Sequence, residues 1–240
     1  MINPVTELID FGRAALLRPV PRDHWQEPSQ VLRRRIVAAV TLVVGAVFLW
    51  YSLRIPAGDP AFYGWTLALA AVWIVGAFAS GPLHLGHAWT RSGGVGRPIV
   101  QSLALAALIT GVFLAGAVVV AQIPPLRGPV DALLDHARFG SLPLVWVITT
   151  INGIGEELYF RGALFAAVGR RHAVSISTVV YTLTTVGTGI PLLVLAAFML
   201  GLLCGLQRRV TGGVLGPTLV HCLWSSSMLF LLPPMLDVLG

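Results

Sequence analysis

The sequence predicts an all-α protein, a polytopic bundle of transmembrane helices with about seven spans. Two features of the composition indicate this class. Of the 240 residues, 56% are hydrophobic and only 11% are charged, whereas soluble domains carry about a quarter charged residues. A third observation is that the apolar residues stand in long runs, close to the roughly 20 residues that a helix needs to cross the hydrocarbon core.

The spans follow one another at short intervals, and the first begins only at residue 36. No small-residue cleavage site follows that span, so we expect no removable signal peptide. The turn "GTGIP" separates the fifth and sixth spans, which makes them the least clearly delimited pair. The expected spans are 36–53, 61–80, 98–122, 141–168, 173–190, 191–207 and 214–236.

The formal net charge of +6 arises entirely from arginine, because the chain has sixteen arginines and no lysine. If the N-terminus is cytoplasmic, twelve arginines fall on inner segments and three on outer segments. This asymmetry follows the positive-inside rule and predicts a multi-pass protein of the cell membrane with its N-terminus in the cytoplasm. The basic excess therefore predicts contact with the lipid membrane, and no nucleic-acid partner. The outer arginines are Arg54, Arg127 and Arg138.

Three regions are expected along the chain. Residues 1–35 form a cytoplasmic N-terminal segment, in which 5–17 is either an amphipathic helix on the membrane surface or part of a flexible tail. Residues 36–140 hold N-terminal transmembrane helices and loops, and 141–236 form a C-terminal core. In the loop after the second span, His84 and His87 have a spacing that can place two imidazoles on one helix face.

The fourth span carries the strongest functional signal, the stretch "EELYFRG" at 156–162. Glu157 and Arg161 are four residues apart, a favourable order for an ion pair on a helix, while Glu156 has no nearby cation in the sequence. Glu156 precedes Arg170, near the expected cytoplasmic exit, by about 21 Å of helix. Ionisable groups at such depth indicate a functional site. The alternative is that both glutamates extend beyond the bilayer.

This stretch resembles the E-E-x-x-x-R motif of the CPBP family of intramembrane proteases, which includes the CaaX prenyl endopeptidases and bacterial abortive-infection and bacteriocin-processing proteins. The similarity covers roughly 141–236, a CPBP-like core. The family pattern continues with F-x-x-x-H, where this chain has Tyr181 and Thr185 in "YTLTT". It ends with H-x-x-x-N/D, where this chain has His221 and Ser225 in "HCLWS".

The resemblance implies roles for these residues. Glu156 would be the general base that activates water, and His221 an oxyanion donor or a metal ligand. Glu157 and Arg161 would fix the geometry of the helix. Thr185 replaces the expected histidine and cannot accept a proton near neutral pH, and Ser225 replaces the asparagine or aspartate. The metal requirement is open, with a divalent metal such as zinc as the candidate.

Two functions are therefore expected as alternatives. The first is an intramembrane endopeptidase, formally a (metallo)endopeptidase, that cuts a membrane-associated peptide or protein. The second is a catalytically degenerate relative that binds or scaffolds a membrane partner without cleaving it. The substituted histidine favours the second, and the intact first motif with His221 favours the first. Taken alone, His221 is better explained as an imidazole that is hydrogen-bonded within the bundle. Together with Glu156, the structural and the functional explanation are even.

Overall fold

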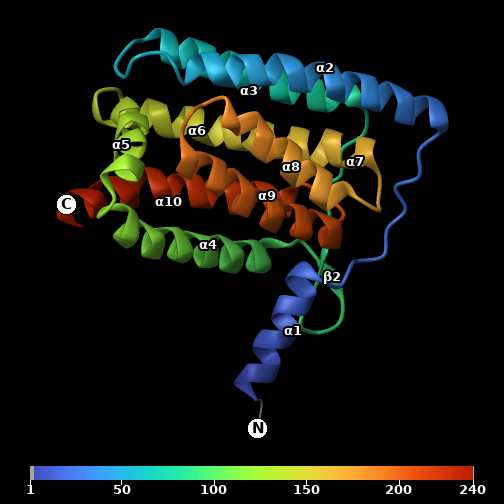
Figure 1. The fold of residues 1–240 in the computed structure, drawn as a ribbon. Helices are drawn as coiled ribbons and strands as arrows, with labels where there is room; N and C mark the ends of the chain where they lie inside the picture. The colour runs from blue at the N-terminus through green and yellow to red at the C-terminus, as the bar shows by residue number, and fades with distance from the viewer. Residues whose placement is uncertain (1–2, 240) are drawn as a thin grey trace.

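The computed structural model describes residues 3–239 as a bundle of helices that run side by side, with α1 projecting from one end (Figure 1). The all-α class is confirmed, because the described chain has no strands beyond one antiparallel pair of two residues each. In chain order the elements are α1 (Pro4–Leu16), α2 (Pro28–Ser52), α3 (Ala61–Ser80), β1 (Ala88–Trp89), β2 (Val95–Gly96), α4 (Ile99–Val120), α5 (Pro124–Arg138), α6 (Leu142–Glu156), η1 (Glu157–Leu164), α7 (Phe165–Val168), α8 (Ala173–Val186), α9 (Pro191–Thr211) and α10 (Leu215–Leu239).

Five helices, α2, α3, α4, α9 and α10, are long and apolar enough to cross a membrane. The protein is therefore a polytopic helical membrane protein. The expected span 141–168 is also helical, but it consists of three consecutive segments, α6, η1 and α7. The expected span 173–190 is too long: α8 has 14 residues, about 21 Å of helix, which falls short of a hydrocarbon core of about 30 Å.

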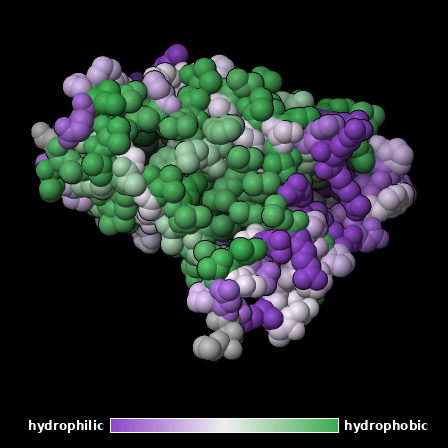
Figure 2. Space-filling view, turned by 60° about the horizontal axis from the view of Figure 1, so that its bottom comes forward, coloured by the Kyte–Doolittle hydropathy of each residue, from purple (hydrophilic) through white to green (hydrophobic). Residues whose placement is uncertain are grey.

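The surface agrees with this assignment. Large apolar side chains point outward along α2 and α4, among them Val43, Val47, Val100 and Leu108. Figure 2 shows hydrophobic residues over most of one face, and hydrophilic residues gathered toward the bottom and right of the view. An apolar belt beside a polar end is what a helix bundle needs when lipid tails and headgroups are its solvent.

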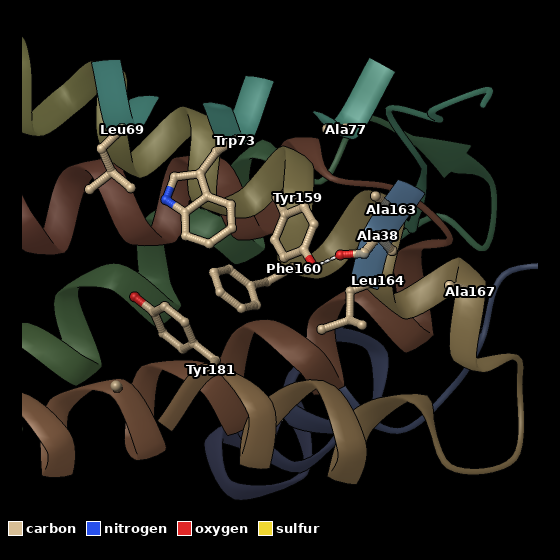
Figure 3. Packing of buried hydrophobic residues seen from close by; sticks show 11 residues of the cluster. Ala38, Leu69, Trp73, Ala77, Tyr159, Phe160, Ala163, Leu164, Ala167 and Tyr181 are labelled. Carbon is tan, nitrogen blue, oxygen red and sulfur yellow. Dashed lines mark hydrogen bonds between the residues drawn. The ribbon is translucent and has the colours of Figure 1, made fainter. Parts of the chain in front are cut away.

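The segment α6–η1–α7 lies at the centre of the bundle. α6 packs against α3 and α10, η1 contacts α2, α3 and α8, and α4 packs against α10 on the far side. Four aromatic side chains join these layers: Trp73 of α3, Tyr159 and Phe160 of η1, and Tyr181 of α8 (Figure 3). The hydroxyl of Tyr159 donates to the Ala38 carbonyl of α2 at 2.6 Å. The central segment is thus held from three sides.

The structure differs from the expectation for His84 and His87, and it contains one of the two alternatives expected near the N-terminus. His84 and His87 do not share a helix face, because α3 ends at Ser80 and Gly81 (φ +137°) begins an extended segment. A helix does form near the N-terminus, at Pro4–Leu16. At the other end of the bundle, α5 begins at Pro124, and proline is well tolerated in the first turn of a helix.

Candidate functional site

The charged motif lies where the central helix changes its hydrogen-bonding pattern. α6 ends at Glu156, and Glu157 begins the π-helix η1. Gly155 lies just before this change and packs closely on α3: a Cβ there would be 3.2 Å from the carbonyl oxygen of Ala70. Segments of π-helix are rare in proteins and occur frequently at functional sites. The two glutamates thus flank a local irregularity in the middle of the bundle.

Glu157 holds a fully buried network of charged and polar groups. Its Oε1 lies 2.8 Å from Arg161 Nη1 and 2.8 Å from His221 Nδ1. The side chains of Glu157 and Arg161 are 0% exposed, and that of His221 is 8% exposed. The expected ion pair of Glu157 and Arg161 is therefore present. Because an ionised carboxylate only accepts hydrogen bonds, Nδ1 of His221 carries a proton and donates it to Glu157.

This contact orients the other nitrogen of His221. The ring lies against α6 at Gly153, where a Cβ would be 3.5 Å from His221 Cδ2. Within residues 3–239, Nε2 of His221 has no hydrogen-bond partner. A carboxylate at one imidazole nitrogen fixes the tautomer and direction of the ring. The free nitrogen is therefore the end of this side chain that is available to other groups.

Glu156 has a different partner. Its Oε2 accepts a hydrogen bond of 2.6 Å from the hydroxyl of Tyr181 on α8. The second oxygen, Oε1, has no partner among the described residues. The ring of Tyr181 also faces Arg161, whose Cζ lies 4.6 Å from the ring centroid, a cation–π distance. Tyr181 thus connects the two glutamates: its hydroxyl contacts one, and its ring contacts the arginine that neutralises the other.

The two substituted positions bond to their own helices. The hydroxyl of Thr185 donates to the Thr182 carbonyl at 2.7 Å, and that of Ser225 donates to the Cys222 carbonyl at 3.3 Å. Such bonds to preceding carbonyls are a common use of hydroxyl groups within helices. Neither hydroxyl contacts Glu156 or His221. At position 185, where the family pattern has a histidine, there is therefore no imidazole.

A cavity of about 580 Å³ collects most of these side chains. Its wall is largely apolar, with α4, α9 and α10 contributing many of the residues, and polar side chains form a minor part of it. Glu157 and Arg161 do not line it. The volume is in the range typical of small-molecule and peptide pockets. The polar residues at its wall include Asn152, Glu156, Tyr181, Thr185, His221 and Ser225.

The donor set does not fit the zinc ion that the resemblance left open. A zinc site takes at least three protein ligands, and residues 3–239 contain no group of three His, Cys, Asp or Glu side chains arranged to hold a metal. Nδ1 of His221 is already bonded to Glu157. Thr185 supplies no nitrogen ligand. We therefore derive the chemistry of this site from its side chains alone.

Sequence reasoning missed two contacts of this site. Glu157 was expected only to pair with Arg161, yet it also holds His221, which lies 64 residues further along the chain. Tyr181 was expected as a matching aromatic residue, and its hydroxyl contact with Glu156 was not expected. The sequence did hold a signal for the contact of Tyr181 with Glu156. A tyrosine at this position has a hydroxyl donor, which the phenylalanine of the family pattern lacks.

Comparison with known proteins identifies a family for part of the chain. The family model for "Type II CAAX prenyl endopeptidase Rce1-like" matches residues 138–227, less than half of the chain. No curated protein and no solved structure matches. The matched stretch runs from the end of α5 into α10, and it contains every residue of the site described above. Residues 138–227 therefore form a domain of the Rce1-like type II CAAX prenyl endopeptidase family.

Proposed function

We propose that the protein is an intramembrane endopeptidase, and that the cavity at Glu156 and His221 is where a membrane-associated peptide is hydrolysed. The observation that carries this proposal is the shared wall: a carboxylate with a free oxygen and an imidazole with a free nitrogen line one cavity inside a membrane-spanning bundle. Positioned acid and base groups of this kind accelerate hydrolysis by about 10²–10⁴-fold each.

Each side chain has a definite task in this proposal. The free oxygen of Glu156 accepts a proton from water as the water oxygen attacks the scissile carbonyl. His221, whose Nδ1 is held by Glu157, donates from Nε2 to the developing oxyanion as an imidazolium, and the proton taken up by Glu156 passes to the leaving amine as the peptide bond breaks. The bond from Tyr181 fixes the direction of the Glu156 carboxylate. Glu157 and Arg161 act as positioning residues behind the wall.

The apolar wall suggests the class of substrate. The family matched by residues 138–227 is described as one of prenyl endopeptidases, and a largely apolar cavity between transmembrane helices suits a lipid-bearing or otherwise apolar peptide. We therefore propose a membrane-associated peptide or protein as the substrate. Its cleavage site would have to approach the part of the cavity wall that holds Glu156 and His221.

One observation favours a second function. The hydroxyl of Thr185 is bonded within its own helix, so Glu156 has no imidazole beside it to share the proton transfers. A protein with this site can bind a lipid-bearing peptide in the same cavity and leave it intact. The second candidate is accordingly a catalytically degenerate member of the family that binds or scaffolds a membrane partner.

Comparing variants in their native membrane separates the two candidates. We expect new peptide termini, read by mass spectrometry of membrane fractions, in cells that express the wild type but not in cells that express Glu156→Gln. This change is nearly isosteric and removes only the proton acceptor. Thr185→His, which restores the family pattern, should raise the yield of the same termini.

The control is Glu27→Gln, which makes the same chemical change at the exposed start of α2. It should leave the termini of the wild type unchanged. Identical terminus profiles in the wild type, Glu156→Gln and Thr185→His, at equal expression, would contradict the protease and leave the binding function as the conclusion.

A further inference from the structure

A second pocket, of about 300 Å³, lies at the end of the bundle where α2 and α4 begin and α3 and α9 end. Its walls are the linker 17–27 between α1 and α2, the extended segment 82–87, and the turn after α9. These segments meet at one end of the bundle (Figure 1). The side chains that can bond a ligand there are Arg22, His24, His84, His87, Arg97 and Thr211.

Backbone hydrogen bonds hold the walls of this pocket together. The amide of Val20 donates to the Val210 carbonyl at 2.9 Å, and that of His87 donates to the Thr211 carbonyl at 2.9 Å. The carbonyl of His84 accepts from the amide of Val214, also at 2.9 Å. Three segments that are distant in sequence are thus tied to one another. The pocket is therefore preorganised, and preorganisation lowers the entropic cost of binding a ligand.

The pocket is strongly cationic. Arg22 and Arg97 line it, and no aspartate or glutamate does. Within residues 3–239, neither arginine has a carboxylate within salt-bridge distance. Arg22 donates to the carbonyls of Arg209 and Val210, and Arg97 donates through Nη1 to the Gly86 carbonyl. The remaining N–H groups of Arg97 have no partner in the described part of the chain.

Three imidazoles face the same space without partners. The rings of His24 and His84 are stacked, with centroids 3.7 Å apart and planes 7° apart. None of the side chains of His24, His84 and His87 is hydrogen-bonded to another described residue. Burial, followed by the charges of His84, Arg208, Arg22 and Arg170, lowers the pKa of His24 to about 4. Among the residues that line the pocket with these rings, none is an aspartate or a glutamate.

A cation does not suit such a pocket. Residues 3–239 offer no group of three His, Cys, Asp or Glu side chains that could hold a metal, and the nearby guanidinium groups would repel one. An anion with several oxygen acceptors suits it, because guanidinium and imidazole donors then each find a partner. A carboxylate has two oxygen acceptors for the five arginine and histidine side chains of the pocket. A phosphate group has more oxygen acceptors and can bond more of these side chains.

We propose that the pocket formed by Arg22, Arg97 and the imidazoles of His24, His84 and His87 binds a phosphate group. The group can belong to a lipid headgroup or to a soluble phosphate compound. Four candidate spans begin or end beside the pocket, which puts it at the level where lipid phosphates lie if those helices cross the bilayer. The site is separate from the cavity at Glu156 and does not depend on the proposed hydrolysis.

The test uses the full chain in detergent micelles with two probes. Inorganic phosphate is titrated while the thermal unfolding midpoint is followed, with acetate at equal ionic strength as the reference. A ligand that binds only the folded state raises this midpoint. In the second arm, phosphatidylglycerol or diacylglycerol, which lacks the phosphate group, is added, and bound lipids are counted by native mass spectrometry.

We expect Arg97→Gln and His84→Leu each to weaken phosphate or phosphatidylglycerol binding by about tenfold, since the first removes a charged donor and the second removes an N–H donor to the ligand. Arg171→Gln, the same change as at Arg97 but at an exposed arginine, should bind as the wild type does. A response to inorganic phosphate identifies a soluble source, and a response to phosphatidylglycerol alone identifies a headgroup. If Arg97→Gln fails to fold, His84→Leu provides the test.

Three results would overturn the proposal. The first is the absence of any response to either probe. The second is an equal response to acetate or diacylglycerol, which would show general anion or lipid effects. The third is equal binding by the wild type, Arg97→Gln, His84→Leu and Arg171→Gln, which would place the ligand elsewhere on the protein.

Discussion

At the scale of single residues, Glu157 is the side chain on which the site depends. It neutralises Arg161 and orients His221 with the same oxygen atom, at 2.8 Å in each case. Glu156, its neighbour in sequence, faces the cavity with a free oxygen. Two adjacent glutamates thus have different environments: Glu157 is buried behind the wall and holds other groups, and Glu156 lines the cavity.

Removing Arg161 tests this division. Arg161→Ala strands the Glu157 carboxylate in a fully buried position, which should cost about 3–5 kcal/mol of stability. We expect a lower thermal unfolding midpoint in detergent and a reduced yield of folded protein. Arg171→Ala, at an exposed arginine, is the control and should change neither. An unfolding midpoint for Arg161→Ala equal to that of the wild type would mean that Arg161 does not stabilise the buried carboxylate.

Contacts within one helix could be predicted from the sequence, and contacts between helices could not. Glu157 and Arg161 are on one helix, so their contact followed from their spacing. The contacts of Glu157 with His221 and of Glu156 with Tyr181 join helices that are distant in sequence, and they depend on how α6, α8 and α10 pack. No local pattern gives that packing, and without an alignment no paired variation reveals it.

At the scale of elements, the length of the apolar runs predicted most of the helices. Where the structure differs, glycine and proline residues end a helix earlier than expected. α2, α3, α4, α9 and α10 appear where long apolar runs predict them. The helix face expected for His84 and His87 is absent because Gly81 and Pro82 end α3, and both residues are strong signals of a turn. The π-helical turn of η1 has no comparable signal, since it reflects the close packing of "EELYFRG" between α2, α3 and α8.

The linker between α1 and α2 gives a prediction about pH. The pKa of His24 is lowered from 6.5 to about 4 by burial and by the charges of His84, Arg208, Arg22 and Arg170. Between these two pH values the unfolded chain binds a proton at this position and the folded chain does not. Stability from this group should therefore fall as the pH decreases from about 6.5 toward 4.

The measurement is the thermal unfolding midpoint in detergent across this pH range, in a buffer without phosphate. His24→Gln should lose less of its midpoint on acidification than the wild type, because glutamine does not titrate. His172→Gln, at an exposed histidine, serves as the control and should follow the wild type. Parallel curves for the wild type and His24→Gln would contradict the lowered pKa.

At the scale of the whole molecule, we propose that the N-terminus is cytoplasmic, that 1–35 lies on the inner side with the loop 81–97, and that 36–140 and 141–236 form the N-terminal helices and the core. The arginine distribution supports this orientation. The two polar ends are also distinct: α5 and the C-terminal end of α10 lie at one end of the bundle, and the linker before α2 lies at the other (Figure 1).

Cysteine labelling tests the orientation. In a chain in which Cys204→Ala and Cys222→Ala remove the native thiols, we introduce Ser92→Cys or Gly128→Cys singly. A membrane-impermeant maleimide should label Gly128→Cys in intact cells, and Ser92→Cys only after the inner face is exposed. Labelling of both positions from the same side would contradict the topology.

The central claim is that a water molecule activated by Glu156 cuts a peptide within this bundle, and oxygen-18 labelling tests it most directly. Membranes that contain the wild type or Glu156→Gln are incubated in water enriched in oxygen-18, and new peptide C-termini are analysed by mass spectrometry. Hydrolysis puts one oxygen from water into each new carboxyl group. We predict labelled C-termini that are specific to the wild type and absent from Glu156→Gln. The same labelled C-termini in both, or none specific to the wild type, would contradict the claim.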